Sequence, residues 1–155
     1  MRRFRTSGPL VGAALACVLS ACGQGPVTVD PPRPAGAAKA ACRALIDNLP
    51  TSVGGGDSRR VDPPDALAAA WGDPPITLRC GVDRPEALTA TSACAEINSV
   101  GWFAEEATRG TIFTTVGRTT YVEVTVPQAY DPPADPLVDL AASVRDHVRA
   151  EQPCQ

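Results

Sequence analysis

The sequence has few of the residues from which catalytic and metal sites are usually built. It contains one histidine, His147, and no cysteines in CxxC spacing, so a zinc site is not indicated. The patterns GxSxG and HExxH and the glycine-rich nucleotide fingerprints are all missing. We interpret His147 as structural, because it falls near the end of a predicted surface helix, where the helix dipole favours a partly charged imidazole. The sequence therefore predicts no cofactor and no metal.

Long hydrophobic runs are also missing after the first 21 residues, so no later segment is expected to span a membrane. At the start of the chain, Arg2, Arg3 and Arg5 precede an uncharged, mostly apolar stretch from Pro9 to Ala21. This stretch is too short to cross a bilayer core of about 30 Å as a helix. The pattern predicts a secretory signal peptide over residues 1–21.

The end of this signal, Leu19-Ser20-Ala21-Cys22, resembles the lipobox of bacterial lipoproteins. In those proteins the cysteine sulfur receives a diacylglyceryl group, and the cysteine becomes the first residue of the mature chain. We therefore expect lipid on Cys22, which would hold the protein on the outer face of the cell membrane, since two or more acyl chains bind stably. The alternative is an ordinary signal peptide cleaved near Ala21, which would leave Cys22 as a thiol.

The mature chain would carry a net negative charge. Removal of residues 1–21 takes away three of the 14 basic residues and none of the 17 acidic ones, which leaves a net charge of −6. This balance argues against nucleic acid as a partner and against electrostatic attraction to anionic lipid. Membrane contact is therefore expected through the lipid. Lys39 is the only lysine, a bias that a high-GC genome such as an actinobacterium's would produce.

Residues 22–36 combine Cys22 with a stretch rich in proline and glycine that has no apolar periodicity. Such a segment is typical of a semi-extended tether, and at about 3.1 Å per residue it would hold a domain roughly 40 Å from the bilayer. A single domain is expected over residues 37–155, a length that suits one ordinary hydrophobic core.

Periodicity within the domain predicts three helices and four strands. Apolar residues recur at helical spacing from Ala38 to Leu49, ALAAAW suggests a short helix, and Asp135 and Pro136 begin a final amphipathic helix. Alternating residues predict strands near 76–82, 95–100, 111–116 and 119–126, the last two joined by a two-residue turn. TSVGGGDSRR is interpreted as a flexible loop. The expected fold class is α+β, a small antiparallel four-stranded sheet with the N- and C-terminal helices packed on one face.

Four cysteines remain once Cys17 leaves with the signal and Cys22 carries lipid. Outside the cytoplasm an even set predicts two disulfides, and loop entropy does not choose among the three possible pairings. The direction of the side chains does favour one of these pairings. Cys42 and Cys80 lie on faces directed to the core, whereas Cys94 alternates with Ala95 and Cys154 lies beyond the last helix. We predict disulfides between Cys42 and Cys80 and between Cys94 and Cys154.

Three stretches, WGDPPITLRCGV (71–82), INSVGWF (97–103) and FTTVGRTTYVEVTVP (113–127), resemble the actinobacterial lipoprotein family called domain of unknown function 3515. The likeness covers residues 41–142. It implies a secreted or lipid-anchored envelope protein and brings no established activity. The residues that match the family's motifs are Cys42, Trp71, Gly72, Asp73, Pro74, Cys80, Gly81, Asn98, Trp102, Gly117, Arg118 and Glu123.

Two functional hypotheses follow. The first is a non-enzymatic binding or accessory module that presents one face to a cell-wall polymer or an envelope protein, and its candidate residues are Trp71, Asp73, Trp102 and Arg118. The alternative is an envelope hydrolase that uses the carboxylates of Asp73, Glu105 and Glu106. Glycosidic chemistry would require two carboxyl groups about 5 to 9.5 Å apart across a cleft.

Overall fold

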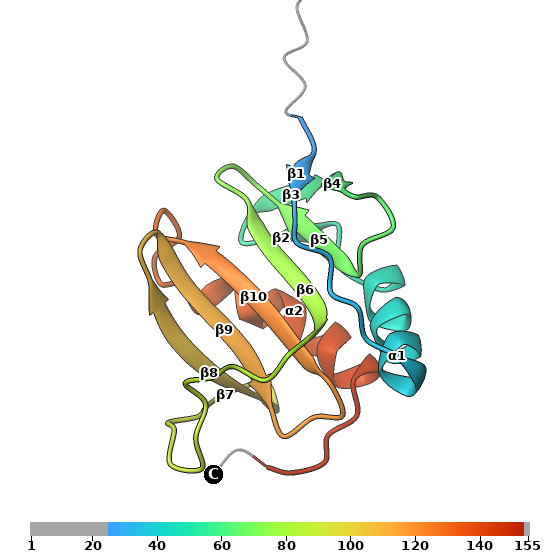
Figure 1. Ribbon diagram of the computed structural model, residues 1–155. Coiled ribbons are helices and arrows are strands. Elements are labelled where there is room, and N and C mark those ends of the chain that lie inside the picture. Colours follow the sequence, from blue (N-terminus) through green and yellow to red (C-terminus); the bar gives the residue numbers. More distant parts are fainter. Residues whose placement is uncertain (1–24, 154–155) are drawn as a thin grey trace, which may run out of the picture.

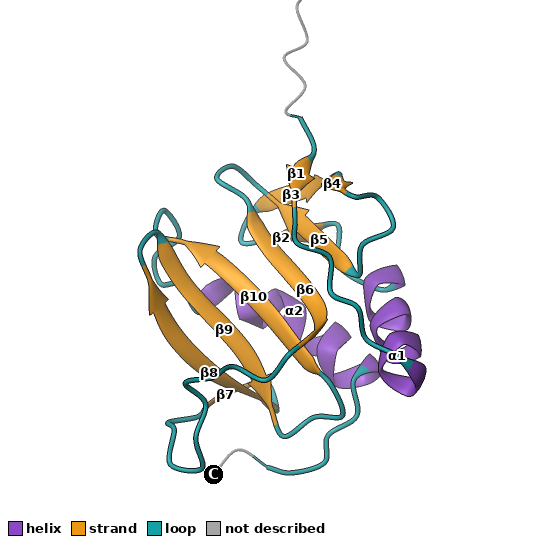
Figure 2. Ribbon diagram, in the orientation of Figure 1, coloured by secondary structure: helices purple, strands orange, loops and turns teal. Residues whose placement is uncertain are grey.

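One antiparallel sheet of eight strands dominates the structure, a computed structural model that describes residues 25–153 (Figure 1). A two-stranded parallel sheet and two helices complete this part of the chain (Figure 2). In chain order the elements are β1 (Val27–Thr28), α1 (Gly36–Asp47), β2 (Ser52–Val53), β3 (Gly56–Arg59), β4 (Val61–Asp62), β5 (Ala68–Trp71), β6 (Ile76–Val82), β7 (Ala95–Ile97), β8 (Val100–Ala107), β9 (Gly110–Val116), β10 (Tyr121–Pro127) and α2 (Asp135–His147). Neither of these two helices has the length and apolar character that a membrane span requires.

The predicted α+β fold with a small four-stranded sheet is wrong, because the chain forms a mostly β fold with twice as many strands in its main sheet. The sequence missed the short strands β2, β3 and β5, which have two to four residues, and all but the first residue of the longer strand β8. The order of the eight strands across the sheet is β2-β3-β5-β6-β10-β9-β8-β7. The predicted strand near 95–100 corresponds to β7, the tight turn at Asn98 and Ser99, both with positive φ, and only the first residue of β8.

The segment ALAAAW, predicted as a helix, contains strand β5 instead. β5 pairs with β3 on one side and with β6 on the other, and three of its four residues are buried. An alanine-rich segment favours a helix when it is considered alone. Here the hydrogen bonds to two neighbouring strands and the burial of both faces outweigh that preference.

The predicted flexible loop TSVGGGDSRR forms the β2–β3 hairpin. Its two turn residues, Gly54 and Gly55, have φ values of 58° and 76°. A two-residue hairpin turn with positive φ at both positions suits glycine, because a side chain would make that conformation costly. Glycine was therefore a turn signal here rather than a sign of disorder.

The hydrophobic core lies between the sheet and the two helices. Alternate residues of β10, Val122, Val124 and Val126, are fully buried, and they share one cluster with Leu78 of β6 and Leu140 of α2. In Figure 1, α2 lies behind β10 and α1 lies beside β6. The opposite face of the sheet carries residues such as Thr77, Arg79, Glu123 and Thr125, which occupy the intervening positions.

Residues 25–35, which fall in the range expected to be a tether, run along the front of the sheet in Figure 1. Val27 pairs with Val61 in the parallel β1–β4 sheet, and Val29 is buried against Ala66 and Ala68. Farther along, Asp30 contacts Arg79 of β6 at 3.6 Å. The chain is thus already folded against the domain at Val27.

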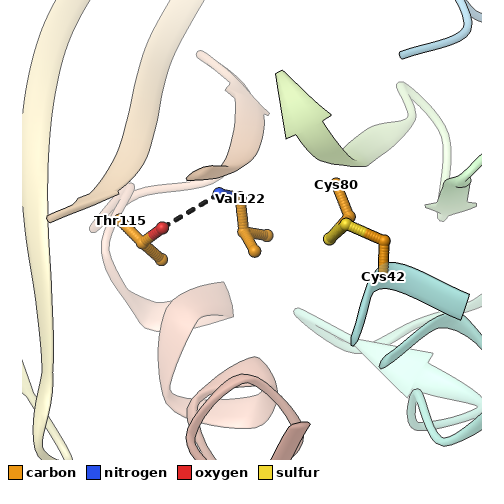
Figure 3. The surroundings of a disulfide bond; sticks show 4 residues. All are labelled: Cys42, Cys80, Thr115 and Val122. Carbon is orange, nitrogen blue, oxygen red and sulfur yellow. Dashed lines mark hydrogen bonds between the residues drawn. A yellow bond between two sulfur atoms is a disulfide. The ribbon is translucent and has the colours of Figure 1, made fainter. Parts of the chain in front are cut away.

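Cys42 of α1 and Cys80 of β6 form a disulfide, the pairing that the sequence favoured (Figure 3). Both residues are fully buried, so the bond joins the first helix to the sheet from inside the core. Cys94 is also a disulfide cysteine. Its predicted partner, Cys154, and the predicted lipidation site, Cys22, both lie outside the described residues.

Near the disulfide, the side chain of Thr115 completes the pairing of β9 with β10. The β10 register shifts between Tyr121 and Val122, and the amide of Val122 donates a hydrogen bond to Thr115 Oγ1 at 2.9 Å (Figure 3). The register shift belongs to the pairing of β10 with β6, whereas the Thr115 hydroxyl accepts the Val122 amide on the other side of β10, toward β9.

Candidate functional site

Both tryptophans that the sequence offered as recognition residues are in the core. Trp71 and Trp102 each expose 1% of their surface. Trp71 Nε1 donates a hydrogen bond to the carbonyl of Pro50 at 2.9 Å, which fixes the ring in the interior. Side chains buried to this degree cannot contact a partner in this conformation, so we do not include them in the site.

Arg118, the third candidate, stabilises the connection between β9 and β10 through hydrogen bonds from its buried side chain. The side chain is 8% exposed and donates hydrogen bonds to the carbonyls of Val148 and Ser99. Burial lowers the pKa of Arg118, and the positive charge of Arg145 lowers it further. The acceptors are main-chain oxygens, one of them at the C-terminal end of α2, where the helix dipole is negative. The role that this geometry supports is structural.

His147 likewise interacts within its own helix. Its Nδ1 atom lies 2.9 Å from the carbonyl oxygen of Ser143, one turn earlier in α2. Within residues 25–153, no group of three or more histidine, cysteine, aspartate or glutamate side chains is placed to hold a metal ion.

Asp73, the fourth candidate, lies at the surface in the turn between β5 and β6. Its side chain is 64% exposed, and its Oδ1 atom is 3.9 Å from Arg59 Nη1. Neighbouring residues help to fix this turn. Gly72 adopts a φ of 71°, and a Cβ at this position would lie only 2.3 Å from the hydroxyl oxygen of Tyr130. That hydroxyl donates a hydrogen bond to the carbonyl of Pro74 at 2.9 Å.

The two prolines after Asp73 form one wall of an open cleft of about 750 Å³ at this end of the sheet. The opposite walls come from the β8–β9 turn and from the residues that follow β10. These segments meet because β6 and β9 begin, and β8 and β10 end, at the same end of the antiparallel sheet. The lining is mainly apolar and includes Pro74, Pro75, Ala107, Arg109, Pro127 and Ala129.

We call this site the proline cleft. The sequence analysis singled out Asp73 and Pro74 as motif residues but missed Pro75, Arg109, Pro127 and Ala129 as lining residues of the cleft. The repeated proline at the ends of strands was the only signal available, and it indicates turns rather than a site. An open apolar cleft with an arginine among its lining residues can bind an apolar group that carries a nearby negative charge.

The carboxylates of the alternative hypothesis do not converge on this cleft. Glu105 and Glu106 are consecutive residues of β8 and therefore point to opposite faces of the sheet. Asp73 precedes β6, which is separated from β8 by two intervening strands. Three strand spacings correspond to roughly 14 Å. No two of these three carboxylates are thus brought together by the sheet.

The fold and the cleft define a mostly β protein that presents an apolar site at one end of an antiparallel sheet. The chain belongs to the family described as "Protein of unknown function (DUF3515)", which it matches over residues 9–153. This description assigns no activity. No curated protein and no solved structure matches the chain.

Proposed function

We propose that this protein is a cell-envelope lipoprotein, anchored through lipid on Cys22 to the outer face of the cell membrane, whose domain is a non-enzymatic binding or accessory module. The observation that carries the location is the buried disulfide between Cys42 and Cys80. Structural disulfides form and persist in oxidising compartments outside the cytoplasm. The lipobox sequence before Cys22 supports the anchor.

The proline cleft supports the binding role. The cleft is mainly apolar, and it is built from three separate parts of the chain that meet at one end of the sheet. A site on rigid elements is preorganised and loses little conformational freedom when it binds. The partner would be an envelope component, such as a wall polymer, an envelope protein or the membrane itself.

The hydrolase alternative is not favoured by the geometry. A glycosidase requires two carboxyl groups about 5 to 9.5 Å apart on either side of the scissile bond. Glu105 and Glu106 lie on opposite faces of β8, and Asp73 lies roughly 14 Å or more away across the sheet. We therefore retain the binding module as the single proposed function.

Attachment is tested with globomycin, which blocks the signal peptidase of lipoproteins. We expect a larger precursor to accumulate under globomycin, and the intact mass of the mature protein to include a lipid that the Cys22→Ser variant lacks. Cys17→Ser is the matched control, because Cys17 belongs to the predicted signal and should not affect the mature mass. A mature protein of unlipidated mass in the culture medium would overturn the anchor.

A further inference from the structure

Arg59 of β3 holds the first described residue beside the turn that precedes β6. Its Nη2 atom donates a hydrogen bond to the carbonyl of Gly25 at 2.9 Å, and its Nη1 atom donates one to the carbonyl of Gly72 at 3.0 Å. The pairing of β1 with β4 reinforces this position, because the amide of Val27 donates to the carbonyl of Arg60. One arginine therefore links Gly25 to the turn whose prolines line the cleft.

The distance between this point and Cys22 is limited by covalent geometry. Gly25 lies three positions after Cys22 in the sequence. A chain extends by at most about 3.6 Å per residue, so the two α-carbons lie within about 11 Å of each other in any conformation. A lipid on Cys22 would thus enter the bilayer close to the end of the domain that carries the proline cleft.

We infer that this end of the domain faces the membrane and that the proline cleft rests on the phospholipid surface. The inference depends on the proposed lipidation of Cys22 and names the partner of the same site. In Figure 1 the chain enters at the upper end, where the β5–β6 turn also lies, and the β9–β10 connection lies at the lower end. The lower end then points away from the membrane.

The composition of the cleft fits a lipid surface better than a charged polymer. Pro74, Pro127 and Ala129 offer apolar atoms to the region between headgroups and acyl chains, while exposed Arg109 can pair with a lipid phosphate. Asp73 and Glu106 are also exposed near this end, so strong electrostatic attraction is not available. Strong electrostatic attraction is not needed, because the short tether to the lipid on Cys22 keeps the cleft near the bilayer at an effective concentration in the millimolar range.

Photo-crosslinking tests this orientation with the lipidated full-length protein in vesicles of phosphatidylethanolamine and phosphatidylglycerol. A benzophenone amino acid is placed at Ala129 in the cleft or, as the matched control, at Thr119. Both residues are exposed, and they lie beyond opposite ends of β10. The seven residues of that strand separate them by about 24 Å. We expect phospholipid adducts at Ala129 to exceed those at Thr119 at least about fivefold, because only the first site lies within reach of the bilayer.

The outcomes separate the two proposals. The intact mass of each protein reports whether Cys22 carries lipid, and an unlipidated mass overturns the proposed function together with this inference. A lipidated protein that gives equal adducts at both positions, or more at Thr119, overturns the orientation alone. An Ala129 adduct with a protein in native membranes, without a lipid adduct, would assign the cleft to a protein partner instead.

Discussion

Arg118, in the connection between β9 and β10, donates a hydrogen bond to the main-chain carbonyl of Val148, the residue that ends α2. A second bond from the same guanidinium reaches the carbonyl of Ser99 in the β7–β8 turn at 2.9 Å. The buried side chain thus joins two hairpins and a helix terminus. Gly117 and Arg118 are motif residues of the family resemblance, and this geometry gives them a structural role.

Arg118→Lys should destabilise the domain. A lysine keeps the charge but lacks the planar fork that reaches two carbonyls at once. We expect the free energy of unfolding to fall by about 1.5–3 kcal/mol, the typical contribution of one hydrogen bond to a charged group. Urea unfolding of the soluble Cys22→Ser form, followed by circular dichroism, measures the change. Arg149→Lys, at an exposed position, is the control and should change stability by less than about 0.5 kcal/mol.

Gly72→Ala should destabilise the turn before β6 for two separable reasons. The residue has positive φ, and its new Cβ would lie 2.3 Å from the hydroxyl oxygen of Tyr130. Gly55→Ala separates the two effects, because Gly55 also has positive φ but has no atom within 4 Å of a Cβ. We expect the free energy of unfolding to fall by about 1 kcal/mol in Gly55→Ala and by about 2–4 kcal/mol in Gly72→Ala.

A double-mutant cycle with Tyr130→Phe tests the cause of the additional loss. Removal of the hydroxyl takes away the atom nearest to the new Cβ, and the next tyrosine atom is 3.5 Å away. Gly72→Ala should therefore cost less free energy of unfolding in the Tyr130→Phe background than in the natural protein. Equal costs in the two backgrounds would show that the hydroxyl is not the obstacle.

Loss of the Cys42–Cys80 disulfide should destabilise the protein more than loss of the bond predicted between Cys94 and Cys154. The first bond lies in the core and connects α1 to β6, whereas Cys94 is only partly buried. We expect Cys42→Ala with Cys80→Ala to lower the free energy of unfolding by about 2–5 kcal/mol. Peptide mapping without reducing agent comes first, because it tests the partner of Cys94. A smaller loss of unfolding free energy on removal of Cys42 and Cys80 than on removal of Cys94 and Cys154 would contradict the prediction.

The elements that the sequence predicted well are those whose pattern is local. Leu137, Leu140 and Val144 mark one face of α2, and Val122 and Val124 mark one face of β10; both elements are found in the structure. Each has one buried and one exposed side, so the periodicity of its apolar residues reveals its type.

The elements that the sequence missed depend on their neighbours. β5 faces the main core through Trp71 and the N-terminal segment through Ala68, so its alanines show no alternation of buried and exposed residues. β2 and β3 are joined by a turn of two glycines that was interpreted as part of a flexible loop. In each case pairing with neighbouring strands, rather than the local sequence pattern, determines the structure.

The candidate site was missed for a related reason. Asp73 and Pro74 were recognised as part of a motif, yet Arg109 and Ala129 carry no pattern of their own. Their common location arises only when the antiparallel register brings three strand ends together. Trp71 and Trp102 show the opposite error, because the sequence proposed them for the site and the structure places them in the core. An aromatic residue is equally typical of a core and of a recognition surface.

Arg59→Ala should loosen the N-terminal segment at Gly25, which Arg59 holds by a hydrogen bond to its carbonyl. The variant loses the hydrogen bonds from its guanidinium to Gly25 and Gly72, whereas the β1–β4 pairing remains. We expect faster amide hydrogen exchange at Val27 and Val29, because local opening becomes easier while the global free energy of unfolding changes little. The adjacent Arg60→Ala is the matched control, since Arg60 contributes its main-chain carbonyl to β1 and that group is kept.

In the lipidated protein, Arg59→Ala should also reduce the excess of phospholipid adducts at Ala129 over Thr119, because a looser connection lets the domain turn over the bilayer. If amide exchange at Val27 and Val29 rises while the ratio of adducts at Ala129 and Thr119 stays unchanged, the Arg59 hydrogen bonds are not needed to hold the cleft on the membrane.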